Sequence, residues 1–336
     1  MPASSSGAQR TSLDGGRWHF HHGPIDIILG ADGDAGSVAA AHEDAWRRFQ
    51  SVLVELVAEL PVLRRAIDPA ALLSDTGEGC PLQGPVARRM WSACWPFRAD
   101  FITPMAAVAG AVAQELVAFY QRPGVSRAWI NNGGDIALHL AAGTSLRIGL
   151  FADLARFDPS DDPAALRTDA DFSIDADSPV RGIATSGWRG RSFSLGIADS
   201  VTVVARTAAA ADAAATVIAN AVDVPGDPRI IRRPACELKD DTDLGHRLVT
   251  CDVLPLPMGS VHDALRAGRA RAMQLRAAGL IGSSILVCQG WFATLEDDTA
   301  HRLAAVAAGP ACVAGASTPE STAGGERFDE VKRLQR

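Results

Sequence analysis

Short runs of β-branched and aromatic residues, separated by tight-turn sequences, are the feature that most constrains the fold of this chain. Residues 17–29 form two such runs around Gly23-Pro24, and residues 127–130 lead into Asn131-Asn-Gly-Gly-Asp135. Ser200–Ala205 alternates in polarity, as a half-buried strand does. These runs predict strands joined by tight turns.

Amphipathic segments predict a few helices between these strands. From Asp34 or Ser37 to Leu60, apolar residues recur at spacings of three and four, and Pro61 ends the pattern. Further helices are predicted over 85–94, 103–121, 208–222 and 261–278. Hairpins interrupted by a few helices fit an α+β fold better than a doubly wound sheet, in which strands and helices alternate regularly. We therefore predict mixed, mostly antiparallel sheets packed with helices.

Composition divides the 336 residues into a domain with two polar ends. Residues 1–16 are rich in Ser and Gly and lack the basic start and apolar segment of a secretory signal, so a flexible leader is expected. Residues 313–336 hold too few large apolar side chains to offset their ordering entropy, which predicts a mobile tail. Residues 17–312 are expected to form an α+β domain, in one lobe or two.

The charge balance excludes some partners. The chain has 32 Lys+Arg and 39 Asp+Glu, a net charge of −7, whereas a protein that binds the phosphate backbone usually carries a basic face. Nucleic acid is therefore not expected as a partner. No run approaches the roughly 18 apolar residues of a spanning helix, so no membrane span is predicted and we expect a cytoplasmic protein. The oligomeric state stays open.

A polar stripe on the predicted helix 208–222 is the first candidate site. Asp212, Thr216 and Asn220 follow one another at intervals of four in a segment that is otherwise small and apolar, so they share one helix face. A carboxylate and a hydroxyl one turn apart are hard oxygen ligands of the kind that Mg²⁺ accepts. The alternative is that Asp212 caps its helix or faces water.

Three other segments can approach a ligand. The predicted helix 103–121, with Thr103 as N-cap and Pro104 at its first position, is thin over residues 106–113, so another backbone or a flat ligand can come close. The sequence around Asn132-Gly133-Gly134 also fits a plain hairpin turn. Residues 181–191 combine glycines with three arginines, and form either an anion cradle or an exposed basic loop.

Familiar catalytic signatures are missing. The sequence contains no G-x-S-x-G, no G-x-x-x-x-G-K-[ST], no H-E-x-x-H and no G-x-G-x-x-G after a strand. His19, His21 and His22 do not make a convincing metal site, because neighbours in a strand point to opposite faces and no further ligand cluster is evident.

Four motifs in order, however, resemble the ApbE superfamily. They are the segments 104–111, 132–135 and 184–187, and Ser200–Ala205 followed by Ala211-Asp-Ala-Ala-Ala-Thr216. Proteins of this superfamily include FAD:protein FMN transferases, which bind FAD and Mg²⁺ and attach FMN to Thr or Ser of a target protein. The closest likeness is to a cytoplasmic branch, and it covers roughly residues 17 to 290.

The resemblance implies site residues position by position. Asp212 and Thr216 match the side-chain Mg²⁺ ligands of the family, and other matched positions lie near the flavin nucleotide. The implied nucleotide-binding residues are Met105, Ala107, Gly110, Asn132, Gly133, Gly134, Asp135, Thr185, Ser186 and Gly187. The expected cofactors are therefore Mg²⁺ and FAD, and the expected partners are a flavin nucleotide or another anionic small molecule and an acceptor protein.

Two departures from the family pattern leave the activity open. The transferases have a Lys-Gly pair where this chain has Ala109-Gly110, and residues 193–199 replace their His-Ile-x-Asp-Pro segment. Without that histidine no general base is evident, and His139 and Asp199 are the substitutes to consider. Three hypotheses follow: an FMN transferase, a flavin- or nucleotide-binding protein without catalysis, or an enzyme for another phosphorylated or acidic molecule bound by Arg189 and Arg191.

Overall fold

A computed structural model describes residues 7–70, 79–150, 170–295 and 301–302. The strands of this part of the chain are β1 Gln9–Ser12, β2 Trp18–His22, β3 Ile25–Gly33, β4 Val125–Asn132, β5 Asp135–Leu140, β6 Ser145–Leu150, β7 Ala170–Asp175, β8 Gly182–Ser186, β9 Ser200–Ala205, β10 Ile230–Pro234, β11 Leu248–Val253, β12 Ser283–Cys288, β13 Trp291–Thr294 and β14 His301–Arg302. The α-helices are α1 Ala35–Ala58, α2 Leu60–Leu63, α3 Pro85–Cys94, α4 Val108–Val117, α5 Ala208–Ala221, α6 Ala235–Leu238 and α7 Met258–Ala277, and the 3₁₀ turns are η1 Asp14–Gly16, η2 Trp95–Phe97, η3 Pro104–Ala107 and η4 Ala118–Tyr120.

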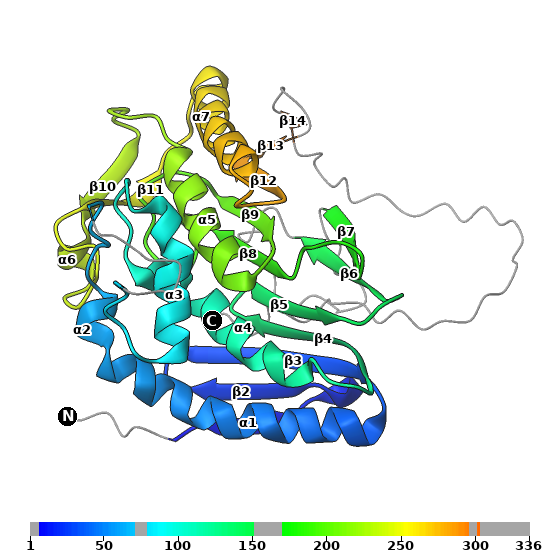
Figure 1. Ribbon diagram of the computed structural model, residues 1–336. Coiled ribbons are helices and arrows are strands. Elements are labelled where there is room, and N and C mark those ends of the chain that lie inside the picture. Colours follow the sequence, from blue (N-terminus) through cyan, green and yellow to red (C-terminus); the bar gives the residue numbers. More distant parts are fainter. Residues whose placement is uncertain (1–6, 71–78, 151–169, 296–300, 303–336) are drawn as a thin grey trace, which may run out of the picture.

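The main sheet is antiparallel between every pair of its described neighbours. Its strand order is β1-β2-β3-β4-β5-β8-β9-β12-β13-β14, and β6–β7 and β10–β11 form two separate hairpins. Helices α1, α3, α4, α5 and α7 lie on one face of this sheet (Figure 1), and their apolar side chains form one continuous core with it. The β6–β7 hairpin packs on the other face over a smaller core that includes Trp129, Leu138 and Ile148. The predicted α+β fold is thus confirmed.

The sheet starts earlier than composition predicts. Strand β1 lies inside segment 1–16 and pairs with β2, from Gln9 opposite His21 to Ser12 opposite Trp18. The four residues of β1 are all exposed, which explains why no apolar pattern marks this edge strand. The predicted tail, 313–336, lies outside the described residues.

The predicted helix over 103–121 is broken into three pieces. Thr103 does not cap it, because the hydroxyl of Thr103 donates to Asp243 instead. The turn η3 ends at Ala107, whose φ of −128° and ψ of 17° lie outside the helical region, and α4 begins only at Val108. The break leaves the first N–H groups of α4 without helical acceptors, so they need partners from elsewhere.

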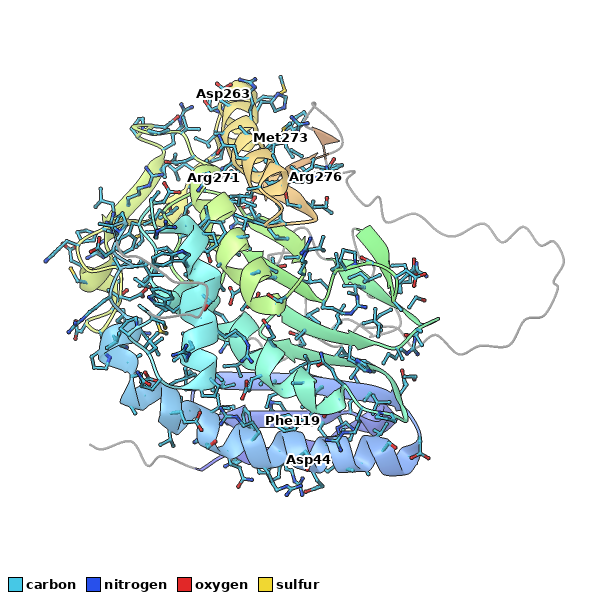
Figure 2. All side chains as sticks on the ribbon, viewed as in Figure 1. Asp44, Phe119, Asp263, Arg271, Met273 and Arg276 are labelled. Carbon is cyan, nitrogen blue, oxygen red and sulfur yellow. The ribbon has the colours of Figure 1, made fainter. Side chains whose placement is uncertain are left out.

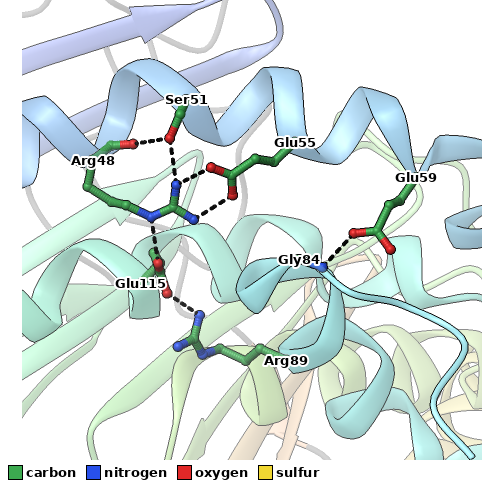
Figure 3. A network of polar contacts seen from close by, with 7 residues as sticks. All are labelled: Arg48, Ser51, Glu55, Glu59, Gly84, Arg89 and Glu115. Atoms are coloured by element: carbon green, nitrogen blue, oxygen red, sulfur yellow. Dashed lines mark hydrogen bonds and ion pairs between the residues drawn. The ribbon is translucent and has the colours of Figure 1, made fainter.

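A polar network holds α4 against α1 and α3 (Figure 3). Both oxygens of the Glu115 carboxylate accept hydrogen bonds at 2.7 Å, one from Arg48 Nε and the other from Arg89 Nη1. Arg48 also binds both oxygens of Glu55, at 2.6 and 2.7 Å. Burial raises the pKa of Glu115, but the two arginines outweigh it and hold that pKa below its ordinary value. Three helices therefore share one charged contact.

Replacing Glu115 with alanine should destabilise the protein by about 2–3 kcal/mol, because two half-buried guanidinium groups lose a charged acceptor. Urea unfolding of E115A against wild type measures this, with E237A, an exposed member of a surface pair, as the control. Because the pKa of Glu115 is depressed, its contribution is present above about pH 4.5 and is lost as the pH falls below it. Equal stability of E115A and E237A would contradict the prediction.

The outer surface of α7 carries charged and flexible side chains. Asp263, Met273 and Arg276 point away from the sheet (Figure 2), and all three are exposed. Arg269 of the same helix donates from Nε to the backbone oxygen of Thr294 at 2.9 Å. In the described part of the chain, no helix combines the length and the apolar character needed to cross a membrane.

Candidate functional site

The carboxylate of Asp212 caps the beginning of α4. Helix α5 has its own N-cap, Thr207, whose hydroxyl accepts from the N–H of Ala210 at 3.2 Å. Asp212, in the next turn, reaches across to the neighbouring helix, where its Oδ2 accepts from the N–H of Gly110 at 2.9 Å. The break at Ala107 supplies this free donor. Asp212 thus caps a helix other than its own, and neither sequence alternative predicts this.

Gly110 permits the close approach of α4 to α5 (Figure 1). A Cβ at this position would stand 2.3 Å from the backbone oxygen of Ala208 and 2.9 Å from Cβ of Asp212. Both distances are shorter than atoms tolerate, so only glycine fits here. The thin part of this helix is predicted to lie close to either another backbone or a flat ligand. At Gly110 the neighbour is the backbone of α5.

The turn between β4 and β5 lies against the same end of α4. Gly133 and Gly134 both have positive φ, 68° and 106°, and the N–H of Gly134 donates to Oδ1 of Asn131 at 2.8 Å. Asn132 pairs with Asp135 across the turn, and its Nδ2 donates to the backbone oxygen of Ala109 at 3.1 Å. The predicted hairpin turn is therefore also the element that brings Asp135 to α4.

Asp135, which is buried, and Asp212, which is half-buried, form an acidic pair. Burial, followed by the negative charge of Asp212, raises the pKa of Asp135 well above its ordinary value, against the opposing effects of the N–H of Thr185 and the charge of Arg191. Burial raises the pKa of Asp212 to about 7, although the N–H groups of Gly110 and Ala109 act in the other direction. Two carboxylates so placed cannot both ionise cheaply without a cation between them.

This pair fits a divalent cation. Oδ1 of Asp135 is buried and has no hydrogen-bond partner among the described residues, so it offers a free hard ligand. Thr216 lies one turn after Asp212 on the same face of α5 and is half-buried. Within the described ranges, however, no group of three or more His, Cys, Asp or Glu residues gathers to hold a metal. Backbone oxygens, water or a ligand's phosphate would have to complete the coordination of Mg²⁺.

The other site residues implied by the resemblance differ in how directly they adjoin this acidic pair. Met105 and Ala107 belong to η3, directly before α4. The N–H of Thr185 acts on Asp135, but its hydroxyl bonds that of Thr202 at 2.9 Å. Because Ile183 packs in the core on the far face of the sheet, Thr185 points there too.

Ser186 ends β8, and Gly187 follows it close to a neighbouring loop. Ser186 is half-buried and follows Thr185, so it points to the helix face of the sheet. A Cβ on Gly187 would stand 2.4 Å from the backbone oxygen of Asp199, so this glycine is required by packing against that loop. Asn220, the last member of the polar stripe, likewise has a structural partner, because its Oδ1 accepts from the N–H of Leu195 at 2.9 Å.

His139 and Asp199, the two residues considered as general bases, are both engaged in other contacts. His139 is four residues along β5 from Asp135, roughly 13 Å at the rise of an extended strand, and its Nε2 contacts the backbone oxygen of Val125 at 3.3 Å. Asp199 accepts from the indole N–H of Trp188 at 3.2 Å and from the N–H of Gln289 at 2.5 Å. Both side chains therefore make contacts that stabilise the fold.

Two features of the site have no signal in local sequence. One is the pairing of Asp135 with Asp212, which lie 77 positions apart in the chain. The other is the separation of the two loop arginines, since Arg191 lies at Gly133 whereas Arg189 lies beside Asp199 at 3.6 Å. Both depend on how strands and loops pack, and a motif records only that the residue types are present.

The fold and the acidic pair define an α+β protein with a candidate site for a cation. The chain belongs to the family described as AbpE bacteria, whose model matches residues 9–294. The predicted membership in the ApbE superfamily is therefore confirmed.

Similar proteins are known in sequence and in structure. A UPF0280 protein of Methanopyrus kandleri is 36% identical over 217 residues, which cover 64% of this chain and 78% of that protein. A UPF0280 protein of Methanospirillum hungatei is 39% identical over 144 residues, which cover 42% of this chain and only 53% of that protein.

Solved structures give weaker likenesses. The ApbE protein of Thermotoga maritima is 12% identical, with 88% of this chain and 96% of that chain covered and a TM-score of 0.39. The apo flavinyl transferase ApbE of Pseudomonas stutzeri is 13% identical, with 85% and 93% covered and a TM-score of 0.35.

Proposed function

We propose that this protein is a Mg²⁺-dependent transferase of the FAD:protein FMN transferase type, which moves FMN from FAD to a Thr or Ser of a target protein. The observation that carries the proposal is the pair of Asp135 and Asp212 at the first turn of α4, in which Oδ1 of Asp135 is buried and has no hydrogen-bond partner among the described residues. Membership in the family supports it, since the pair contains the Asp that the resemblance implies as a metal ligand.

The residues of the site would divide into those that hold the cation and those that leave room for the diphosphate. Asp212, Thr216 and Asp135 would hold the cation, which when bound supplies positive charge to neutralise the leaving phosphate. Asn132, fixed to Ala109, keeps the Gly133-Gly134 turn at α4, so that a diphosphate can approach without side chains in its way. In the reaction, the oxygen of the acceptor hydroxyl bonds to the phosphorus of FMN, the P–O bond to AMP breaks, AMP leaves, and the hydroxyl proton is released to water.

A flavin- or nucleotide-binding protein without catalysis is the second candidate. It is favoured by His139 and Asp199, because His139 lies four residues along β5 from Asp135 and both side chains are engaged in backbone or indole contacts. Transfer to a hydroxyl group needs a proton acceptor within hydrogen-bond reach of that hydroxyl.

Incubation with FAD and Mg²⁺, with and without a cell-lysate acceptor, separates these functions. AMP release together with flavin attached to protein is the result that the transferase proposal predicts. AMP with free FMN would instead indicate a pyrophosphatase. Tight FAD binding without AMP would support the second candidate, and no flavin binding at all would overturn both and favour another phosphorylated or acidic ligand.

A further inference from the structure

Arg191 lies over the glycine turn of the candidate site. Its Nη1 is 3.2 Å from the point that a Cβ on Gly133 would occupy, and its Nη2 is 3.4 Å from the backbone oxygen of Pro24. Its charge also acts on Asp135, on the adjoining strand. The side chain is exposed, so most of the donors of its guanidinium remain accessible.

The other two arginines of segment 181–191, Arg181 and Arg189, make contacts within the fold. Arg181 donates to the backbone oxygens of Ser178, Val180 and Ala176 at 2.6 to 2.8 Å. Arg189 lies 5.0 Å from the ring centre of Trp188 and 3.6 Å from the carboxylate of Asp199. Of the three arginines, Arg191 is therefore the one turned toward the acidic pair.

Charge balance indicates what Arg191 faces. Asp135 and Asp212 carry two negative charges when ionised, which equals the charge of one divalent cation. A diphosphate ligand next to them brings two further negative charges that the pair cannot offset. A guanidinium is suited to this task, because its planar fork binds two phosphate oxygens at once.

We propose that Arg191 binds the diphosphate of a nucleotide at the Gly133-Gly134 turn, so that the anion lies between Arg191 and the Asp135–Asp212 pair. This inference deepens the proposed function and rests on it for the choice of ligand. Glycine is favoured at position 133 by its positive φ of 68°, and a Cβ there would stand 3.2 Å from Nη1 of Arg191. Phosphate recognition thus comes from a loop and metal recognition from α5.

Calorimetric titration of R191A tests the inference, with Mg²⁺-ADP, FAD and riboflavin as probes. We expect R191A to bind Mg²⁺-ADP and FAD at least tenfold more weakly than wild type and to bind riboflavin, which has no phosphate, as wild type does. R191K keeps the charge without the fork and should fall in between. R276A, which removes an exposed arginine on α7, should match wild type.

The outcomes separate this inference from the transferase function. If R191A binds Mg²⁺-ADP as tightly as wild type, or if wild type does not bind it, Arg191 is not a diphosphate ligand, whatever the fate of FAD. An equal loss of riboflavin binding would also overturn the inference, because it would indicate a damaged site. If R191A loses Mg²⁺-ADP while wild type releases no AMP from FAD, the inference holds and the transferase function fails.

Discussion

Asp212→Asn should abolish the stabilisation that Mg²⁺ gives to the wild-type protein. A cation at about 100 times its dissociation constant stabilises the folded state by about 2.7 kcal/mol, which is a rise in Tm of about 4 °C for a protein of this size. The neutral amide can still accept from the N–H of Gly110, so α4 stays capped, but it no longer supplies the charge that a divalent cation requires.

Without Mg²⁺, the same variant should be more stable than wild type at pH 8. The folded-state pKa of Asp212 is raised to about 7, so the stability contributed by its protonated form is present at low pH and is lost as the pH rises through about 7. The amide carries no such penalty, so the difference in stability should be smaller at pH 5 than at pH 8 and should vanish below about pH 4.

Thermal unfolding with and without Mg²⁺ at pH 5 and pH 8 measures both effects. D263N removes one exposed carboxylate on α7 and is the control for the change in net charge. A Mg²⁺-dependent rise in Tm that is the same in D212N and in wild type would contradict the assignment of Asp212 as a ligand.

Gly110→Ala should destabilise the protein by about 2 kcal/mol or more, although alanine favours a helix by about 1 kcal/mol. The added methyl group would stand 2.3 Å from the backbone oxygen of Ala208, and backbone atoms of a packed helix cannot turn away. Helix α4 must then move from α5, which also stretches the hydrogen bond from Gly110 to Asp212. We therefore expect a weaker response to Mg²⁺ as well.

The matched control is Gly259→Ala in α7, where an added Cβ meets no atom within 4 Å. Urea unfolding should place G259A at or above wild type and G110A well below it. If G110A were as stable as G259A, the contact between α4 and α5 would be looser than the structure indicates, and the small residues of this segment would need another explanation.

Local sequence predicts the regular elements where one face is apolar. Helix α3 and strand β9 have the predicted bounds, and α1 begins after Asp34, whose carboxylate accepts from the N–H of Ser37 at 2.9 Å. Strand β7 lies in an acidic stretch for which local sequence predicts no strand. Its pairing with β6 supplies the order that its own pattern does not indicate.

The break at Ala107, which places the first turn of α4 at the site, is not predicted by local sequence. The residues from Thr103 onward satisfy every rule for a helix start, yet Thr103 bonds Asp243, 140 positions later in the chain. The carboxylate of Asp212 then stabilises a helix that begins at Val108, because it accepts a hydrogen bond from the N–H of Gly110 in the first turn. Sequence placed Asp212 and Thr216 on one face of α5, but the partner of that face is set by tertiary contacts.

Crystals of the protein soaked with Mn²⁺ and ADP would test the central claim most directly, because manganese is located by its anomalous scattering. The account predicts one manganese peak within about 2.2 Å of a carboxylate oxygen of Asp212, with oxygen from Asp135 or Thr216 also in its coordination sphere. A manganese ion bound elsewhere, or none beside Asp212 at saturating concentration, would contradict it.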